Sequence, residues 1–166
     1  LMISFVMFFA GIGYKISCFP FHMWTPDVYQ GSPIPVTTFF SIVPKMAGMA
    51  ALIRVSMTFF STETTLAVTW VGLILVVAAM TMTVGNITAI GQSSVKRLLA
   101  FSSIGHVGNM ILGIVVLNEA GVQAILFYGI AYLFMTLIAF YITSALSDMY
   151  GTDSYDVFKG LIYKHP

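Results

Sequence analysis

Basic residues interrupt apolar stretches at three positions of the chain that could carry protons. Lys15 closes an apolar run that begins at Leu1, and Lys45 lies well inside the next one. His106 lies in the middle of a third, within the sequence SSIGHVGN. A charge at the bilayer centre costs about 2.5–3.5 kcal/mol on insertion scales, so packing alone would favour leucine at both lysines.

The chemistry that such residues offer is proton transfer. A low-dielectric environment penalises the charged form of lysine, and a nearby carboxylate restores it. Lys15 could therefore take up or release a proton as a partner moves, and Lys45 on the next helix would couple to it by repulsion. Histidine titrates near neutrality, so His106 could bridge the path. The alternatives are lysines that extend to the membrane interface and a hydrogen-bonded core histidine.

The composition is that of a membrane protein. Of 166 residues, 58% are hydrophobic and 8% are charged, against about 25% charged in soluble domains. The net charge of +1 gives no support to a nucleic-acid partner. Cys18 is the single cysteine, so we expect a small apolar filler rather than an internal disulfide or a metal cluster. The residues by themselves indicate proton or cation movement and no bond chemistry.

Apolar runs predict an all-α integral membrane protein with five transmembrane helices, of which the first is broken. We expect one transmembrane domain over 1–166, with spans at 1–30, 34–60, 66–90, 95–117 and 122–146 and a cytoplasmic tail at 147–166. The chain begins inside an apolar run without Met, so we expect it to be a fragment.

Prolines are expected to interrupt two of these spans. A helix over 1–16 would rise about 24 Å, short of the roughly 30 Å hydrocarbon core. Pro20 and Pro26 each remove a backbone donor, so they predict a break followed by a short second piece near 24–30. Pro44 predicts a kink and a free carbonyl at Phe40, beside Lys45.

Loop charges predict the orientation. With alternating spans, four basic residues fall on one side, whereas the opposite loops carry Glu63 and Glu119. The positive-inside rule then places the turns at 17–33 and 91–97 and the tail in the cytoplasm. Asp27 is read as a turn or helix-capping acid, and Trp24 and the tyrosines as interface anchors. The four basic residues are Lys96, Arg97, Lys159 and Lys164.

Three stretches carry a family resemblance. They read GYKISCFPFHMWTPDVYQGSPIPVTTFF, SVKRLLAFSSIGHVGNM and KGLIYKHP. They closely resemble the antiporter-like N-subunit family of proton-pumping NADH:quinone oxidoreductase, complex I. The resemblance implies a core of fourteen helices with two inverted repeats, of which this chain would be helices seven to eleven. Lys15 and Lys45 would match the lysines of the seventh and eighth helices, and His106 a polar position of the path.

The resemblance also implies the partners and the mechanism. Protons would move as electrons pass from NADH to quinone, with Lys15 exchanging a carboxylate partner and passing a proton through water towards Lys45. NADH, FMN, iron–sulfur clusters and quinone would be bound by partner subunits, and this chain would hold no cofactor and no metal. The acidic partner of Lys15 and a twelfth-helix lysine would lie outside the chain. Pro44 departs from the family, which often has a small residue there.

Other membrane-arm subunits and the lipid bilayer would then surround the chain, and we favour the bacterial cytoplasmic membrane over the mitochondrial inner membrane. Two alternatives remain open at this stage. One is a subunit of a cation/proton antiporter without redox activity, which the lysine pair fits equally well. The other is a non-conducting structural subunit, in which the lysines pair with acids on a neighbour.

Overall fold

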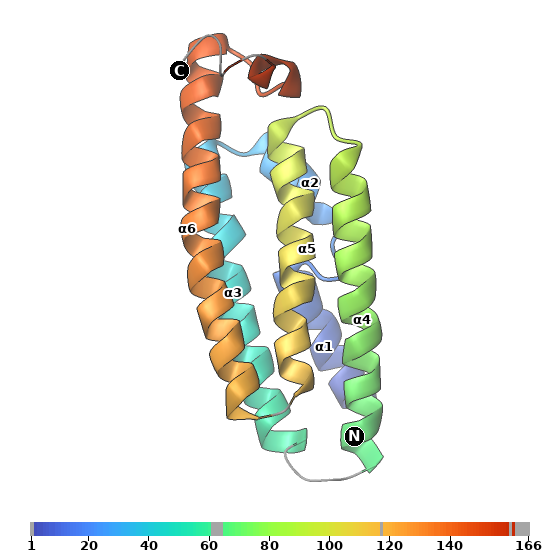
Figure 1. Ribbon diagram of the computed structural model, residues 1–166. Coiled ribbons are helices and arrows are strands. Elements are labelled where there is room, and N and C mark those ends of the chain that lie inside the picture. The colour runs from blue at the N-terminus through green and yellow to red at the C-terminus, as the bar shows by residue number, and fades with distance from the viewer. Residues whose placement is uncertain (1, 61–64, 117, 160, 162–166) are drawn as a thin grey trace.

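A computed structural model describes residues 2–60, 65–116, 118–159 and 161. These residues form helices joined by short connections, so the all-helical prediction is confirmed (Figure 1). The helices are α1 (Met2–Ile16), α2 (Trp24–Gly31), α3 (Ile34–Phe60), α4 (Thr65–Ile90), α5 (Val95–Val115), α6 (Glu119–Tyr150) and the short 3-10 helix η1 (Tyr155–Phe158).

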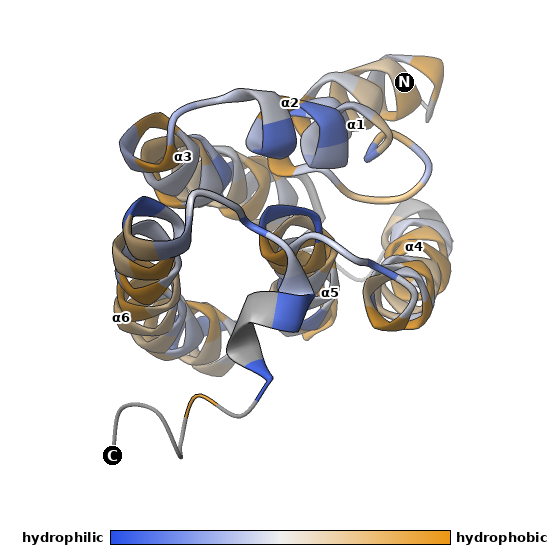
Figure 2. Ribbon diagram, turned by 90° about the horizontal axis from the view of Figure 1, so that it is seen from above, coloured by the Kyte–Doolittle hydropathy of each residue, from blue (hydrophilic) through white to orange (hydrophobic). Residues whose placement is uncertain are grey.

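The helices form two layers. Viewed from above, α3, α2 and α1 lie in one row, and α6, α5 and α4 lie in the other (Figure 2). The helices α3, α4, α5 and α6 are each long and apolar enough to cross a membrane. Their outer faces expose large apolar side chains such as Phe127 and Ile138, as lipid contact requires. Cys18 is buried in the core, as predicted for a small apolar filler.

The first span is broken between α1 and α2, as the sequence predicts. Residues 17–23 connect the two pieces without regular helix, and Pro20 lies in this connection. Pro26, however, does not break a helix. It lies in the first turn of α2, where a backbone N–H would have no acceptor within the helix and proline costs little.

Pro44 lies inside α3, which runs on through it from Ile34 to Phe60. Proline within a membrane helix is tolerated where neighbouring helices and local adjustments compensate for the lost hydrogen bond. The expected kink beside Lys45 stays a prediction.

The helix α6 is longer at both ends than the span predicted at 122–146. It begins at Glu119, because Asn118 caps it by accepting a hydrogen bond at Oδ1 from the Gly121 amide at 2.9 Å. It ends at Tyr150, where Gly151 adopts a left-handed φ of 70°. The first four residues of the predicted tail therefore belong to this helix, whereas α5 ends at Val115, before the expected 117.

Glycines set the spacing between helices at two interfaces. A Cβ added at Gly85 on α4 would lie 2.5 Å from the Gly105 amide nitrogen on α5. A Cβ at Gly48 on α3 would collide with the Ile16 side chain at the end of α1. Close helix contact at small residues is typical of membrane bundles. At Gly48, it brings the end of α1 against the helix that carries Lys45.

A polar cluster ties three segments together at one end of the bundle (Figure 1). Arg97 at the start of α5 contacts Asp27 and Gln30 on α2, at 2.8 and 3.0 Å. Ser94 donates to Asp153 in the tail at 2.7 Å. Asp27 is thus an exposed first-turn acid paired with Arg97. The segments expected to share one side of the membrane meet at one end of the bundle, and their compartment stays a prediction.

Candidate functional site

Lys45 is buried between the two layers of helices. Its side chain is 1% exposed, on the face of α3 that packs against α5. The ammonium donates to Ser103 Oγ at 2.6 Å, and Ser103 Oγ in turn donates to the Ala100 carbonyl at 2.6 Å. The Lys45 Nζ also lies 5.6 Å from the centre of the Tyr29 ring, in cation–π geometry.

Lys45 has no carboxylate partner among the described residues. The ion pairs there join Arg97 to Asp27 and Lys159 to Asp156, and neither pair includes Lys45. In each pair at least one of the two side chains is exposed. A buried ammonium held by a hydroxyl and an aromatic face is only partly compensated for its lost hydration. Its charge therefore depends strongly on what polar groups and water lie next to it.

A small cavity with both polar and apolar side chains in its wall lies beside Lys45, among α3, α5 and α6. Its volume is about 80 Å³. Ser103, which holds the Lys45 ammonium, lines it together with His106. A polar space of this size has room for water, because one water molecule in the liquid occupies about 30 Å³. The remaining polar residues around it are Ser41, Ser102, Tyr132 and Thr136.

His106 lies on α5 about one turn beyond Ser103, so the helical period places both side chains on one face. Its Nδ1 lies 2.7 Å from Tyr128 Oη on α6, and the same oxygen accepts a hydrogen bond from Asn109 Nδ2 at 2.9 Å. The His106 ring centre is 5.3 Å from that of Tyr132. The structure thus places His106 on a cavity whose wall includes Ser103, the residue whose hydroxyl binds Lys45.

Lys15 is placed differently. It lies in the last turn of α1 at the helix break, with an exposed side chain. It lines an open apolar hollow of about 360 Å³, together with Trp24 from α2 and Phe40 and Pro44 from α3. The structure does not bring Lys15 into the cavity beside Lys45. The described residues therefore show no direct route for a proton between the two lysines. The role of Lys15 stays a prediction.

The sequence reading missed the aromatic and hydroxyl residues around Lys45. Tyr29 and Tyr132 are 0% and 2% exposed, so the expectation that the tyrosines are interface anchors is wrong for these two. Tyr132 is held by hydrogen bonds to the side chain and carbonyl of Ser41. Tyr29 Oη is buried without a partner among the described residues. The missed signal was helical spacing, since Tyr128, Tyr132 and Thr136 recur every fourth residue along α6.

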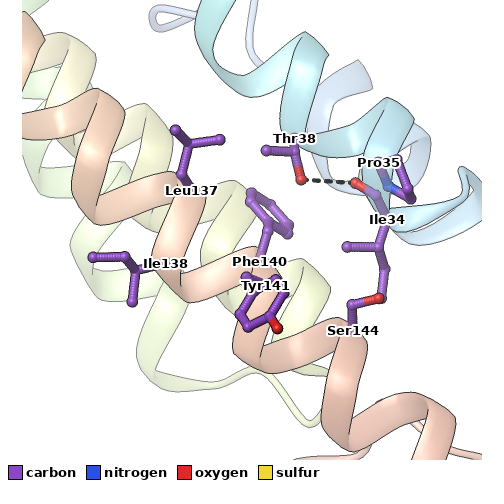
Figure 3. A pocket seen from close by; sticks show the side chains of 8 residues that line it. All are labelled: Ile34, Pro35, Thr38, Leu137, Ile138, Phe140, Tyr141 and Ser144. Atoms are coloured by element: carbon purple, nitrogen blue, oxygen red, sulfur yellow. Dashed lines mark hydrogen bonds between the residues drawn. The ribbon is translucent and has the colours of Figure 1, made fainter.

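A further hollow differs in chemistry. It has a volume of about 580 Å³ and lies between the start of α3 and the second half of α6 (Figure 3). Its lining is almost wholly apolar, and the Thr38 hydroxyl there turns back to the Ile34 carbonyl at 2.8 Å. Its polar groups are the hydroxyls of Thr38, Tyr141 and Ser144, and no lysine or histidine lines it. Among the described residues, no three His, Cys, Asp or Glu side chains lie close enough together to hold a metal ion.

Comparison with known proteins decides the family. The family described as NADH:quinone oxidoreductase/Mrp antiporter, transmembrane, matches residues 1–166. The chain belongs to this family. The chain is 49% identical over 165 residues to the NADH-quinone oxidoreductase subunit N 2 of Sorangium cellulosum, covering 95% of this chain and 32% of that one. The resemblance seen in the sequence is thereby confirmed.

Solved structures of this antiporter-like family have the same fold. A chain of respiratory complex I from Thermus thermophilus superposes with a TM-score of 0.74 at 38% identity, covering 94% of this chain and 33% of that one. A chain of the membrane-bound sulfane sulfur reductase, an archaeal respiratory complex, gives 0.81 at 28% identity, covering 90% and 30%. The chain is thus a multi-pass membrane protein that spans about a third of the length of these relatives.

Proposed function

We propose that this chain is the proton-carrying part of an N-type membrane subunit of NADH:quinone oxidoreductase. The observation that supports this most is Lys45, a buried ammonium with no carboxylate partner among the described residues, beside a polar cavity shared with His106. Such a group can change its protonation when nearby charges move. We assign the chain to this enzyme because its relatives are named as NADH-quinone oxidoreductase subunit N.

In this proposal the chain moves protons and carries out no redox step. NADH, FMN, the iron–sulfur clusters and quinone are bound by partner subunits, and the chain contacts other membrane-arm subunits and lipid. Charge shifts that follow electron transfer alter the protonation of Lys45, and Ser103, His106 and water in the cavity pass the proton on. The membrane is the bacterial cytoplasmic membrane, with the cluster around Arg97 on the cytoplasmic side.

Lys15 completes the path in this proposal. Its exposed side chain faces an apolar hollow, where a lone ammonium in lipid would be costly. We infer that a carboxylate from outside this chain pairs with it, as the family resemblance implies. Exchange of that carboxylate would release the Lys15 proton towards α3. One transmembrane domain over 1–166 then forms part of the larger helical core.

A rival function is a cation/proton antiporter subunit without redox activity, because the matched family also includes Mrp antiporters. The experiment that separates the two uses the full-length parent chain, tagged, in gently solubilised native membranes. We expect the tag to migrate with the band that stains for NADH dehydrogenase activity under native electrophoresis. A tag that runs apart from that band, with cation-driven pH changes in vesicles, would establish the antiporter instead.

A further inference from the structure

The hydroxyl of Tyr128 joins two side chains of α5. Asn109 Nδ2 is a donor, so Tyr128 Oη is the acceptor in their 2.9 Å hydrogen bond. Tyr128 Oη also lies 2.7 Å from His106 Nδ1, and a phenol carries a single proton. Asn109 and His106 are three residues apart, so one turn of α5 presents both to the same hydroxyl.

We propose that Tyr128 is a positioning residue that holds His106 in one tautomer, an inference that rests on the proposed function. Asn109 fills an acceptor position on the phenol oxygen, and the phenol proton is then directed to His106 Nδ1. A nitrogen that accepts this bond is unprotonated, so the ring proton of the neutral histidine lies on Nε2. If His106 Nδ1–H instead donated to Tyr128 Oη, the phenol proton would have no acceptor among the described residues.

This arrangement controls where His106 can gain a proton. With Nε2 already protonated, the neutral ring can accept only at Nδ1, the nitrogen that Tyr128 covers. His106 therefore becomes doubly protonated only when the Tyr128 hydroxyl turns away or reverses its bond. Tyr128 in this way couples the charge of His106 to the position of α6 relative to α5.

The titratable groups that face His106 come from two other helices. Tyr128 and Tyr132 approach from α6, and Lys45 approaches from α3 through Ser103. Tyr29 on α2 faces Lys45, and α4 carries no titratable side chain between Thr65 and Ile90. The protonation of His106 thus responds mainly to Lys45 and to the hydrogen bond from Tyr128.

The test uses the assembled complex reconstituted in vesicles, with Tyr128→Phe compared with Tyr141→Phe. Tyr141 is an exposed tyrosine on the same helix, so this matched control loses a hydroxyl far from His106. We expect protons pumped per NADH to fall roughly two- to tenfold in Tyr128→Phe, the range for a single lost hydrogen bond. Its pH profile, measured between about pH 6 and pH 8, should shift by roughly half a unit or more. An unchanged profile would overturn the inference.

A double-mutant cycle shows whether Tyr128 acts through His106. In a His106→Gln background, Tyr128→Phe should cause no further loss of pumping, whereas an additive loss contradicts the proposal. If Tyr128→Phe does not assemble, Asn109→Leu removes the donor to the phenol oxygen while keeping the phenol, and it should also shift the profile. If neither Tyr128→Phe nor Asn109→Leu shifts the pH profile while Lys45→Met cannot pump, the inference about Tyr128 is wrong and the proposed function still stands. Normal pumping by Lys45→Met removes the proposed function itself.

Discussion

Lys45 and Lys15 lie on adjacent helices, yet the fold surrounds them very differently. The Lys45 ammonium is buried, bonded to Ser103 on α5 and close to the ring of Tyr29 on α2. Lys15 is exposed beside an apolar hollow. The described residues enclose Lys45 and bind its ammonium, whereas they leave Lys15 exposed.

Two hollows of the bundle repeat this contrast in their linings. The polar cavity beside Lys45 is small, and hydroxyl and imidazole groups line it. The hollow between α3 and α6 is several times larger but almost wholly apolar (Figure 3). The larger hollow is therefore not the one beside the buried lysine. His106 and Ser103, whose hydroxyl binds Lys45, line the smaller space.

The largest effect is expected from separating the helices that carry the two lysines. Gly48→Leu places a side chain where Ile16 packs, which displaces the end of α1 from α3. Overpacking of this kind costs roughly 1–3 kcal/mol. We expect the yield of assembled complex to fall strongly, as native electrophoresis would show. Gly72→Leu is the control, because a Cβ there meets nothing within 4 Å.

The second prediction tests whether Lys15 belongs to the path. Lys15→Met removes the charge while keeping an unbranched side chain, and we expect pumping per NADH to fall roughly fivefold or more as the proton loses its carrier. Lys159→Met, at an exposed lysine of the tail, should pump normally. Equal pumping by Lys15→Met and wild type would leave Lys45 as the sole lysine of the path.

The third prediction concerns the hydroxyl that holds Lys45. Ser103→Ala removes the 2.6 Å hydrogen bond to the ammonium, and a lost bond of this kind costs about 1–3 kcal/mol. We expect pumping to fall roughly threefold to tenfold at constant assembly, measured in vesicles. Ser144→Ala, on the wall of the apolar hollow, serves as control. A similar loss in both variants would show that Ser103 has no special link to Lys45.

The smallest effect is expected at the polar cluster around Arg97. Its cation is partly exposed, unlike the buried Lys45. Arg97→Gln breaks a partly exposed ion pair with Asp27, which is worth roughly 0–1 kcal/mol. Pumping should stay near normal, and the thermal stability of the complex should fall by no more than a few degrees. A stability loss as large as that of Gly48→Leu would contradict this ranking.

The helical plan and the burial of Lys45 could be predicted, because both follow from long apolar runs. The polar residues around Lys45 could not be predicted. Ser103 on α5 and Tyr132 on α6 reach Lys45 and Ser41 only when these helices pack on α3. Helix ends were missed where a cap decides them, as at Asn118. Pro44 lies inside α3, where neighbouring helices can compensate for the hydrogen bond that proline removes, and the kink predicted there stays a prediction.

The most direct test of the account is the number of protons pumped per NADH oxidised by the Lys45→Met complex. Methionine fills much of the lysine volume without a charge, so the buried site should still pack. We predict an assembled complex whose pumping falls at least roughly tenfold. Normal pumping by the assembled Lys45→Met complex would contradict the claim that protons pass through this residue.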